Sequence, residues 1–307
     1  MNMSPLKYLL IVALAFQASC SSAQPDEDPD SNQQDVFVEP IWTLDLEMQI
    51  SETSGLISWD GVLWTHNDDT DTRLYLLDPS TAEIVGDYEL PGVVNQDWEE
   101  ISQDEQYIYV GDFGNNRGDR DNLSILRVEK SSLKSGSPSI DTIWFSYSDQ
   151  PSLVSDGLNQ TEFDCEAFVV SSDSIYLFTK QWLSGNTTRY VLPKVPGRHV
   201  AQKREVLNIQ GLVTGASYLE EERLLVLCGY AGLSQPFLCI FSEYPHDDFF
   251  SGTHKRVNLS LPFHQVEAVC TSDGIHYYVS NERQSVNSYM NIPARMHFFD
   301  LEKVLEE

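Results

Sequence analysis

The sequence predicts an all-β protein, specifically a five-bladed β-propeller. Two observations carry this prediction. From residue 41 onward helical periodicity is scarce, and short apolar runs alternate with turn residues. In addition, one unit recurs five times, and in each copy a short polar-then-apolar segment precedes an aromatic-rich strand by about ten residues. The expected strands include 62–65, 74–77, 107–111, 123–128, 175–179, 224–227, 237–241, 275–280 and 296–301.

Each unit begins with an opening segment that we expect to start an inner strand. The opening segments are 53–56, 98–101, 165–168, 214–217 and 266–269. Their equivalent positions, called the opening residues below, are Ser54, Glu99, Glu166, Thr214 and Glu267, spaced by 45, 67, 48 and 53 residues. Four-stranded propeller blades have this length, with one long insertion around 149–161. The alternative is a ring of six blades, which would need a degenerate blade between 99 and 166.

The two ends of the repeat region predict how the ring closes. The fifth unit runs out of chain after its third strand, at 294–302, while a strand-like segment, 41–49, precedes the first unit. We expect 41–49 to complete the last blade, because closing the ring removes open sheet edges.

The amino-terminal segment has the pattern that is typical of an export signal. Lys7 supplies the positive end, and the apolar run 8–16 is too short to span a bilayer. The sequence therefore predicts a signal peptide at 1–19, an acidic flexible tether at 20–37 and the propeller domain at 38–307.

Cys20 follows two small residues and resembles the lipobox of bacterial lipoproteins, with Gln17 in place of the usual Leu. The resemblance implies a diacylated Cys20 and a lipoprotein of the cell envelope. Cleavage after Ala23 is the alternative, and it predicts a secreted or periplasmic soluble protein.

Charge and cysteine content limit the partners and crosslinks. Lys and Arg number 19 against 47 Asp and Glu, a formal net charge of −28. This excludes nucleic-acid binding through phosphate contacts and leaves a lipid anchor as the expected membrane contact. We expect a monomer. Cys228 and Cys239 flank a turn near 231–235, so they either face each other across a hairpin or remain free buried thiols.

The opening residues predict a metal site on the axis. The inner strands of a propeller line its axis, so the five opening residues should converge at one end. Crowded, buried carboxylates have raised pKa values unless a cation compensates them, and oxygen ligands of this kind favour Ca²⁺. The alternative is that each glutamate pairs locally with a backbone amide.

The opening residues also resemble a known pattern. The calcium-dependent apyrases, or soluble calcium-activated nucleotidases, are five-bladed propellers whose blades open with Ser, Glu, Glu, Ser and Glu around a central Ca²⁺. The same order occurs here, with Thr214 in place of the fourth hydroxyl residue. As a whole the chain is more similar to uncharacterised exported propeller proteins of Bacteroidota-type bacteria, through 97–101 and 111–117. That second resemblance implies fold and location but no activity.

Five loops, each following a second strand, should surround the opening residues: 66–73, 112–122, 180–189, 229–236 and 281–295. They contain the basic residues Arg73, Arg117, Arg120, Lys180, Arg189, Arg283 and Arg295. Cations gathered beside a bound metal suggest an anionic ligand. The candidate ligand-binding residues are Arg117, Lys180, Trp182, Tyr230 and Arg283.

Two functions remain open at this stage. The first is noncatalytic binding of an anionic small molecule, a glycan or a protein on the loop face, which Trp182 and Tyr230 fit. The second is a metal-assisted phosphohydrolase acting on a nucleotide or phosphoester, in which Asp68, Asp69 or Asp112 acts as general base.

Overall fold

The computed structural model describes residues 36–306, apart from 70 and 288–289. By internal contacts the chain divides into two units, 1–34 and 35–307, and the second is described below. The predicted signal peptide, the lipidation site Cys20 and nearly all of the predicted tether lie outside the described residues. No helix among the described residues is long and apolar enough to cross a membrane.

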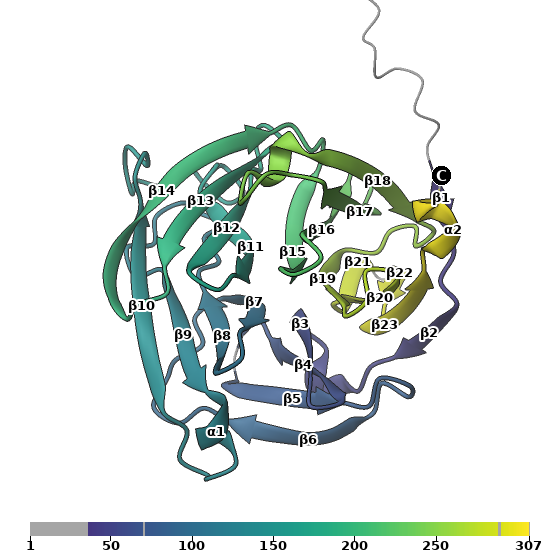
Figure 1. Cartoon of the computed structure of the whole chain (residues 1–307), viewed down its shortest axis with the longest axis horizontal. Helices are drawn as coiled ribbons and strands as arrows, with labels where there is room; N and C mark the ends of the chain where they lie inside the picture. The colour runs from purple at the N-terminus through teal and green to yellow at the C-terminus, as the bar shows by residue number, and fades with distance from the viewer. Residues whose placement is uncertain (1–35, 70, 288–289, 307) are drawn as a thin grey trace, which may run out of the picture. The chain divides into compact units, whose positions relative to one another are not determined.

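The described strands form five four-stranded antiparallel ladders around a common axis (Figure 1). The first four follow the chain order, each running from an inner to an outer strand. They are β3–β6 (Thr53–Trp59, Val62–Asn67, Arg73–Leu77, Ile84–Glu89), β7–β10 (Trp98–Gln103, Tyr107–Asp112, Ser124–Glu129, Ile140–Tyr147), β11–β14 (Asp164–Val170, Ser174–Lys180, Thr187–Pro193, Gly197–Leu207) and β15–β18 (Leu212–Leu219, Leu224–Ala231, Gln235–Ser242, Thr253–Leu259). The fifth is β19 (Val266–Thr271), β20 (His276–Asn281), β23 (Arg295–Asp300) and β2 (Trp42–Asp45).

This arrangement confirms the all-β propeller fold. The number of ladders among the described residues equals the number of units that the repeat spacing predicts. Between β10 and β11, residues 148–163 contain no strand, so the long interval holds an insertion. Parallel pairing of β10 with β14 joins the second and third ladders into one eight-stranded sheet.

The amino-terminal segment closes the ring, as the sequence predicts. Strand β2 pairs antiparallel with β23, with Trp42 opposite Phe298 and Leu44 opposite Met296. The strand is shorter than expected, because a 3-10 helix, η1 (Met48–Ile50), follows it. A preceding strand, β1 (Phe37–Val38), pairs in parallel with β18, so the propeller begins at the end of the predicted tether.

Apolar side chains fill the spaces between neighbouring ladders. Five buried clusters occur among the described residues, and each draws its members from two adjacent ladders. Cys228 and Cys239 belong to different clusters on opposite faces of the fourth ladder, and both are free. The register pairs Cys228 with Leu238 instead. A disulfide across this hairpin, one of the two interpretations of the sequence, is therefore wrong.

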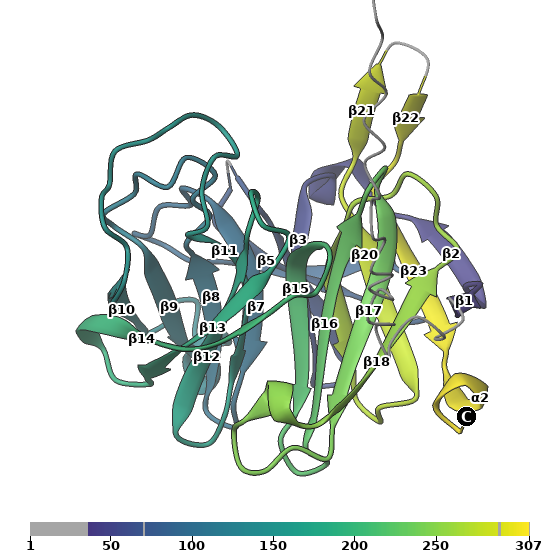
Figure 2. The same cartoon turned by 90° about the horizontal axis from the view of Figure 1, so that it is seen from above.

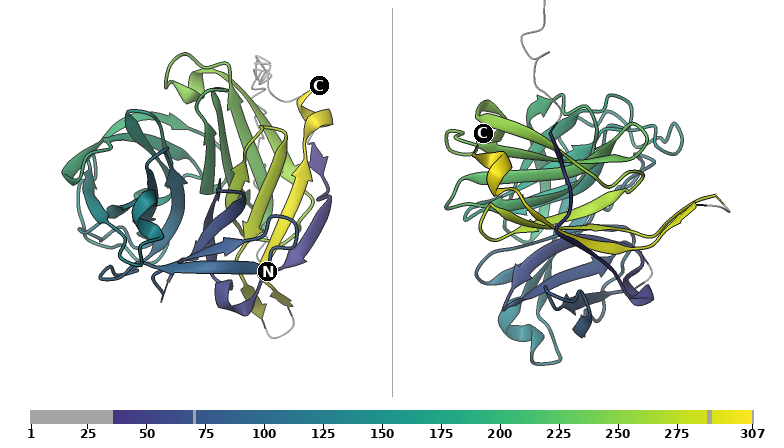
Figure 3. Two further views of the ribbon diagram at one scale, coloured as in Figure 1. Left: turned by 60° about the horizontal axis from the view of Figure 1, so that its bottom comes forward. Right: turned by 90° about the vertical axis from the view of Figure 1, so that its right-hand side faces the viewer.

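Each inner strand begins at the same face of the ring, called the opening face below. The insertion 148–163 and a hairpin, β21 (Gln284–Asn287) with β22 (Met290–Ile292), both rise from this face (Figure 2). The hairpin stands out from the fifth ladder (Figure 3). Two short helices, α1 (Lys130–Leu133) and α2 (Glu302–Leu305), and a second 3-10 helix, η2 (Phe249–Ser251), complete the described elements.

Candidate functional site

A β-bulge lies at or next to the opening residue of each inner strand. In four ladders the pairing skips this residue, since the register shifts between Trp98 and Glu100 and at the three equivalent places around Glu166, Thr214 and Glu267. In the first ladder the shift follows Ser54 directly. A bulged residue has no directly opposite partner, and the local bend redirects its side chain. The repeat thus bends every inner strand at the same level of the axis.

The starts of the inner strands and the loops of the opening face enclose a cavity of about 310 Å³, called the axial cavity below. Its polar lining is dominated by carboxylates. Six of them line it: Asp68, Asp97, Glu99, Glu166, Glu267 and Glu282. Lys180 is the single basic residue among the described lining residues.

Four of the five predicted metal ligands line the axial cavity: Ser54, Glu99, Glu166 and Glu267. Thr214 is buried outside its lining. The two hydroxyl residues have a structural contact in common, because Ser54 Oγ donates to the Glu99 carbonyl at 2.5 Å and Thr214 Oγ1 donates to the Val266 carbonyl at 2.6 Å. Each hydroxyl therefore joins its inner strand to the next one.

The structure separates the other predicted site residues. Lys180, Trp182, Tyr230 and the candidate base Asp68 line the axial cavity. The other four predicted site residues do not line it. Arg117, Asp69 and Arg283 are exposed, and Arg283 Nε donates to Asn291 Oδ1. Asp112 forms an ion pair with Arg120 at 2.7 Å. The remaining basic loop residues also have acidic partners, since Arg73 pairs with Asp87, Arg189 with Glu205 and Arg295 with Asp45.

Lys180 is an internal cation of the axial cavity. Its Nζ lies 3.2 Å from Glu166 Oε2, and the two side chains are 7% and 3% exposed. The same Nζ lies 4.7 Å from the ring centroid of Trp182 and 5.6 Å from that of Tyr230, within cation–π range. Burial acts to lower the pKa of Lys180, but the surrounding negative groups, Glu166 first, outweigh burial and hold this pKa well above its usual value. The ammonium is therefore charged.

For the carboxyl groups of the cavity, burial and neighbouring negative charges both disfavour the ionised form. Burial, followed by the charges of neighbouring carboxylates, raises the pKa values of Glu99 and Glu267 well above the usual range. Burial is also the largest cause at the cavity's edge, where it and nearby carboxylates raise the pKa of Asp97 to about 6, of Glu282 to about 7 and of Asp68 to about 8. One lysine does not compensate these groups, so the cavity takes up protons or a cation.

Several residues of the site were not predicted from the sequence. Asp97 lies beside Glu99, and Gly114 makes this approach possible, since a Cβ at Gly114 would lie 2.1 Å from Glu99 Oε1 and 2.4 Å from Asp97 Oδ2. Asp164 orients the indole ring of Trp182, because its carboxylate accepts a hydrogen bond from Trp182 Nε1 at 2.7 Å. The same carboxylate accepts one from the backbone amide of Asn115 at 2.6 Å. Asp97 and Gly114 lie in the segments 97–101 and 111–117, the two segments that carry the resemblance to exported propeller proteins.

Glu100 lies one layer below the axial cavity and is fully buried. Its carboxyl accepts the Ile101 amide at 3.0 Å and the Ala216 amide at 2.7 Å, and it also accepts the backbone amide of Leu56. These amides belong to the second, fourth and first ladders. Glu100 is therefore a structural hub between inner strands, although its neighbour Glu99 faces the cavity.

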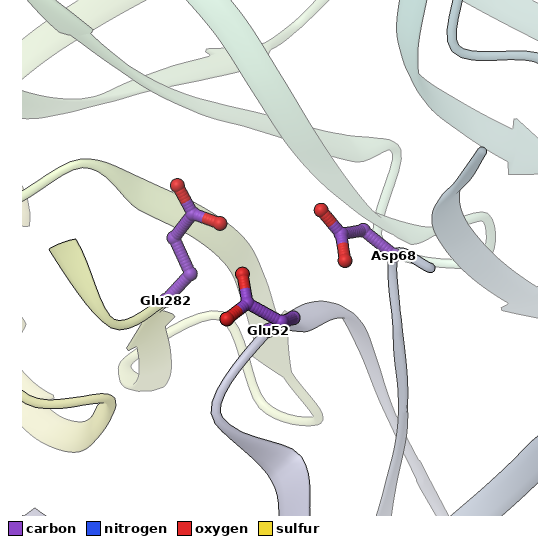
Figure 4. Close-up of side chains that lie close together, drawn as sticks. All are labelled: Glu52, Asp68 and Glu282. Carbon is purple, nitrogen blue, oxygen red and sulfur yellow. The ribbon is translucent and has the colours of Figure 1, made fainter. Parts of the chain in front are cut away.

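A group of three carboxylates at the edge of the axial cavity was also missed. Oxygen atoms of Glu52, Asp68 and Glu282 all lie within 4.8 Å of one another (Figure 4). Glu52 directly precedes β3, Asp68 directly follows β4 and Glu282 directly follows β20. No repeat position marks Glu52 or Glu282, so no pattern in the sequence predicts that they lie together.

Comparisons with known proteins address the fold. No family model matches the sequence, and no curated protein matches it. The chain is similar to the solved WD40 repeats of RRP9, with a TM-score of 0.43 and 8% identity over 84% of this chain and 97% of that one. It is also similar to the structure of a streptogramin B lyase, with a TM-score of 0.40 and 10% identity over 85% and 87%.

The ladders and the cavity together define the class, a β-propeller with an acidic axial cavity. Membership in a particular family, including the two that the sequence resembles, stays a prediction.

Proposed function

We propose that the protein is a noncatalytic binding propeller that holds a divalent cation, Ca²⁺, in its axial cavity and binds a partner molecule on the opening face. One observation carries the proposal: among the described residues, six carboxylates line the cavity beside a single lysine. If all are ionised, six negative charges and one positive charge leave a balance of −5 in a largely buried space.

The cost of burying uncompensated charge favours a cation here. Buried carboxylates either bind protons or require a compensating charge, and removing that charge is expensive. A divalent ion supplies two positive charges, and Ca²⁺ accepts six to eight oxygen ligands in irregular geometry. The lining offers oxygen ligands from carboxylates, the Ser54 hydroxyl and the Gln265 and Asn116 amides. This ligand chemistry suits Ca²⁺ better than a softer metal.

The nature of the partner follows from the same charges. An anionic ligand alone meets acidic walls, since Arg117 and Arg283 are not part of the cavity and Lys180 is paired with Glu166. A carboxylate, phosphate or sugar hydroxyl can instead bind as a ligand of the cation. The rings of Trp182 and Tyr230 beside it suit the apolar face of a sugar or a peptide side chain.

Hydrolysis of phosphoesters is the second candidate, and one observation favours it. Asp68 lines the cavity with a pKa raised, mainly by burial, to about 8, so it can exchange a proton near neutral pH. Phosphate release from a panel of nucleotides and phosphoesters, with Ca²⁺ and with chelator, tests this candidate. Calcium-dependent release establishes hydrolysis, whereas no release across the panel contradicts it.

We also propose that the protein is exported and held at the cell envelope by a lipid on Cys20, as a monomer. The predicted signal peptide, the lipobox-like segment at Cys20 and the polar, acidic tract that follows it support this location. Cys20→Ala should move the protein from the membrane fraction to the soluble fraction. A wild-type protein that is already soluble, with Gln24 at its amino terminus, contradicts the lipid anchor.

Thermal unfolding with chelator and with Ca²⁺ tests the cation. Binding to the folded state adds roughly 2.7 kcal/mol of stability when free Ca²⁺ is about 100 times its Kd. Glu267→Gln removes a lining carboxylate and should reduce this gain. The matched control is Glu222→Gln, which removes the same charge from an exposed residue on the opposite face and should leave the gain intact. A wild type whose melting ignores both chelator and Ca²⁺ contradicts the proposal.

A further inference from the structure

The negative charge of the axial cavity is divided into two groups. Around the ring centre, Glu166 pairs with Lys180. At the rim between the first and last ladders, Glu52, Asp68 and Glu282 make no ion pair with any Lys, Arg or His among the described residues. Resting on the proposed function, we infer that the cation binds at this rim, on Glu52, Asp68 and Glu282 beside Glu267, and not at the ring centre beside Glu166 and Lys180.

The rim has the dimensions of a calcium site. One oxygen of each of the three carboxylates lies within 4.8 Å of the others. Calcium–oxygen distances of about 2.3–2.6 Å place two ligands on opposite sides of the ion about 4.6–5.2 Å apart, so all three oxygens can touch one Ca²⁺. Figure 4 shows the three side chains reaching toward a common space from three separate segments.

The rim also contains carboxylate oxygens that lack a partner. Asp68 Oδ1 is buried, yet no described group donates a hydrogen bond to it. Glu267 is 8% exposed and lines the same cavity as Asp68 and Glu282, and its carboxylate makes no hydrogen bond or ion pair with any described residue. A buried carboxylate without donors is costly, and a cation shared with the rim is the compensation that this geometry permits.

The backbone holds the rim in place. The Asp68 amide donates to the Glu52 carbonyl at 2.9 Å, and the Trp98 amide donates to the Asp68 carbonyl at 2.7 Å. On the other side, the Arg283 amide donates to the Ser51 carbonyl at 2.7 Å, which ties the residue after Glu282 to the residue before Glu52. The three ligands are therefore preorganised, and ordering them costs little on binding.

The ring centre is less suitable because it already holds a charge. The Lys180 ammonium lies 3.2 Å from Glu166, so a divalent ion bound there would face a like charge at short range.

Binding at the rim has a structural consequence. Glu52 precedes β3 and Asp68 follows β4, both strands of the first ladder, whereas Glu282 follows β20 of the last ladder, which β2 completes. One Ca²⁺ would then join the two ends of the ring. Calcium should strengthen this closure in addition to filling the cavity.

Calorimetric titration of the full-length protein with Ca²⁺ tests the location. Glu52→Gln and Glu282→Gln each remove one rim ligand and should raise the Kd by at least about tenfold, as losses at or next to a metal do. Glu99→Gln removes the same charge from the ring centre and is the matched control, with an expected change below about threefold. Melting in chelator verifies that each variant is folded.

The outcomes separate the two proposals. A loss for Glu99→Gln that equals or exceeds the loss for the rim variants overturns the rim site but keeps the cation-binding propeller. No Ca²⁺ binding by the wild type overturns both. As a second readout, Ca²⁺ should slow amide hydrogen exchange where β2 pairs with β23 in the wild type but not in Glu282→Gln. Unchanged exchange in the wild type contradicts the closure role.

Discussion

The two ends of the propeller axis are built from the same five inner strands but have different chemistry. At the opening face, six carboxylates and one lysine line the axial cavity. At the opposite face, a cavity of about 190 Å³ has no Asp, Glu, Lys or Arg among its described lining residues. At this opposite face the inner strands therefore meet without charged side chains in the cavity lining.

The neutral end shows what the inner strands need. Neighbouring strands are joined there by hydrogen bonds from neutral groups: Gln103 Nε2 donates to the Ser58 carbonyl, the Val170 amide to Ser102 Oγ and the Thr271 amide to Ser217 Oγ. Ser54 and Thr214 make the same kind of bond at the opening face. Within the described part of the chain, the cavity-lining Glu99 and Glu267 do not make such bonds to the backbone of a neighbouring strand. Burial instead raises the pKa values of their carboxyl groups. The acidic end is therefore the end at which we propose binding.

Glu100 gives the strongest test of this comparison, because it is a buried carboxyl with a structural role. Glu100→Ala leaves the amides of Leu56, Ile101 and Ala216 without their acceptor, and each unsatisfied buried group costs about 1–3 kcal/mol. We expect a loss of about 3–5 kcal/mol by urea unfolding, with or without Ca²⁺. A loss below about 1 kcal/mol would mean that the inner strands do not depend on this hub.

Lys180 tests whether the acidic end needs its internal cation. Lys180→Met keeps the length and apolar contacts of the side chain but leaves Glu166 and its neighbours without a positive charge. Breaking a buried pair in this way typically costs about 3–5 kcal/mol, and proton uptake by the carboxyls should reduce the loss to about 2–4 kcal/mol. Added Ca²⁺ should restore part of it. Chemical unfolding in chelator and in Ca²⁺ measures both effects, and a fully stable variant in chelator would contradict the role of Lys180.

The pH dependence of stability should come from the acidic end. Asp97, Glu282 and Asp68 have folded pKa values of about 6, 7 and 8, raised first by burial, so the folded state binds more protons than the unfolded chain in this range. Their contribution is present at low pH and is lost as pH rises through these values. In chelator, lowering the pH from about 8 to about 6.5 should therefore add about 1–2 kcal/mol.

Two histidines limit this pH window and provide a control. Burial lowers the pKa of His66 to about 4 and of His297 to about 3, so below about pH 6.5 their contribution to stability is progressively lost and opposes the carboxyl groups. Saturating Ca²⁺ should keep the carboxylates ionised and remove the gain above pH 6.5. Melting curves in chelator that do not change between pH 6.5 and 8 would contradict the excess charge at the opening face.

The smallest effect is expected at the neutral end. Ser217→Ala removes the hydroxyl that accepts the Thr271 amide at 3.3 Å, and a long hydrogen bond of this kind contributes about 0.5–1 kcal/mol. Its response to Ca²⁺ should equal that of the wild type. A changed Ca²⁺ response in this variant would show that the two ends of the axis are coupled.

The repeat explains why much of the fold could be predicted. The opening residues recur at equivalent positions, and each lies at or next to a β-bulge at the start of an inner strand. The closing strand could be predicted because the fifth unit lacks an outer strand and a strand-like segment, 41–49, precedes the first unit. Its exact length could not, since η1 ends the segment through local turns that the alternation of residues does not show.

The loops explain why much of the candidate site could not be predicted. Lys180 and Arg117 are both basic loop residues, yet one is buried against Glu166 and the other is exposed. Lys180 ends β12 and meets Glu166 of the neighbouring strand β11, whereas Arg117 lies in the loop after β8. Asp112 likewise has its Oδ1 bonded to Arg120, whereas Asp68 has an oxygen without any described partner.

By itself, the sequence determined the all-β propeller, the closure by the amino-terminal strand and the level on the axis where the opening residues lie. These features follow from strand periodicity and from hydrogen bonding within one ladder, which repeat along the chain. Only the tertiary structure decided that Lys180 is the cavity's own cation and that Glu52, Asp68 and Glu282 meet at the rim. For the rim, the physical reason is that the distances are set by backbone bonds between the first and last ladders, and no local pattern records which distant segments those bonds bring together. For Lys180, the reason is that the bulge beside Glu166 changes which side chains of β11 and β12 meet.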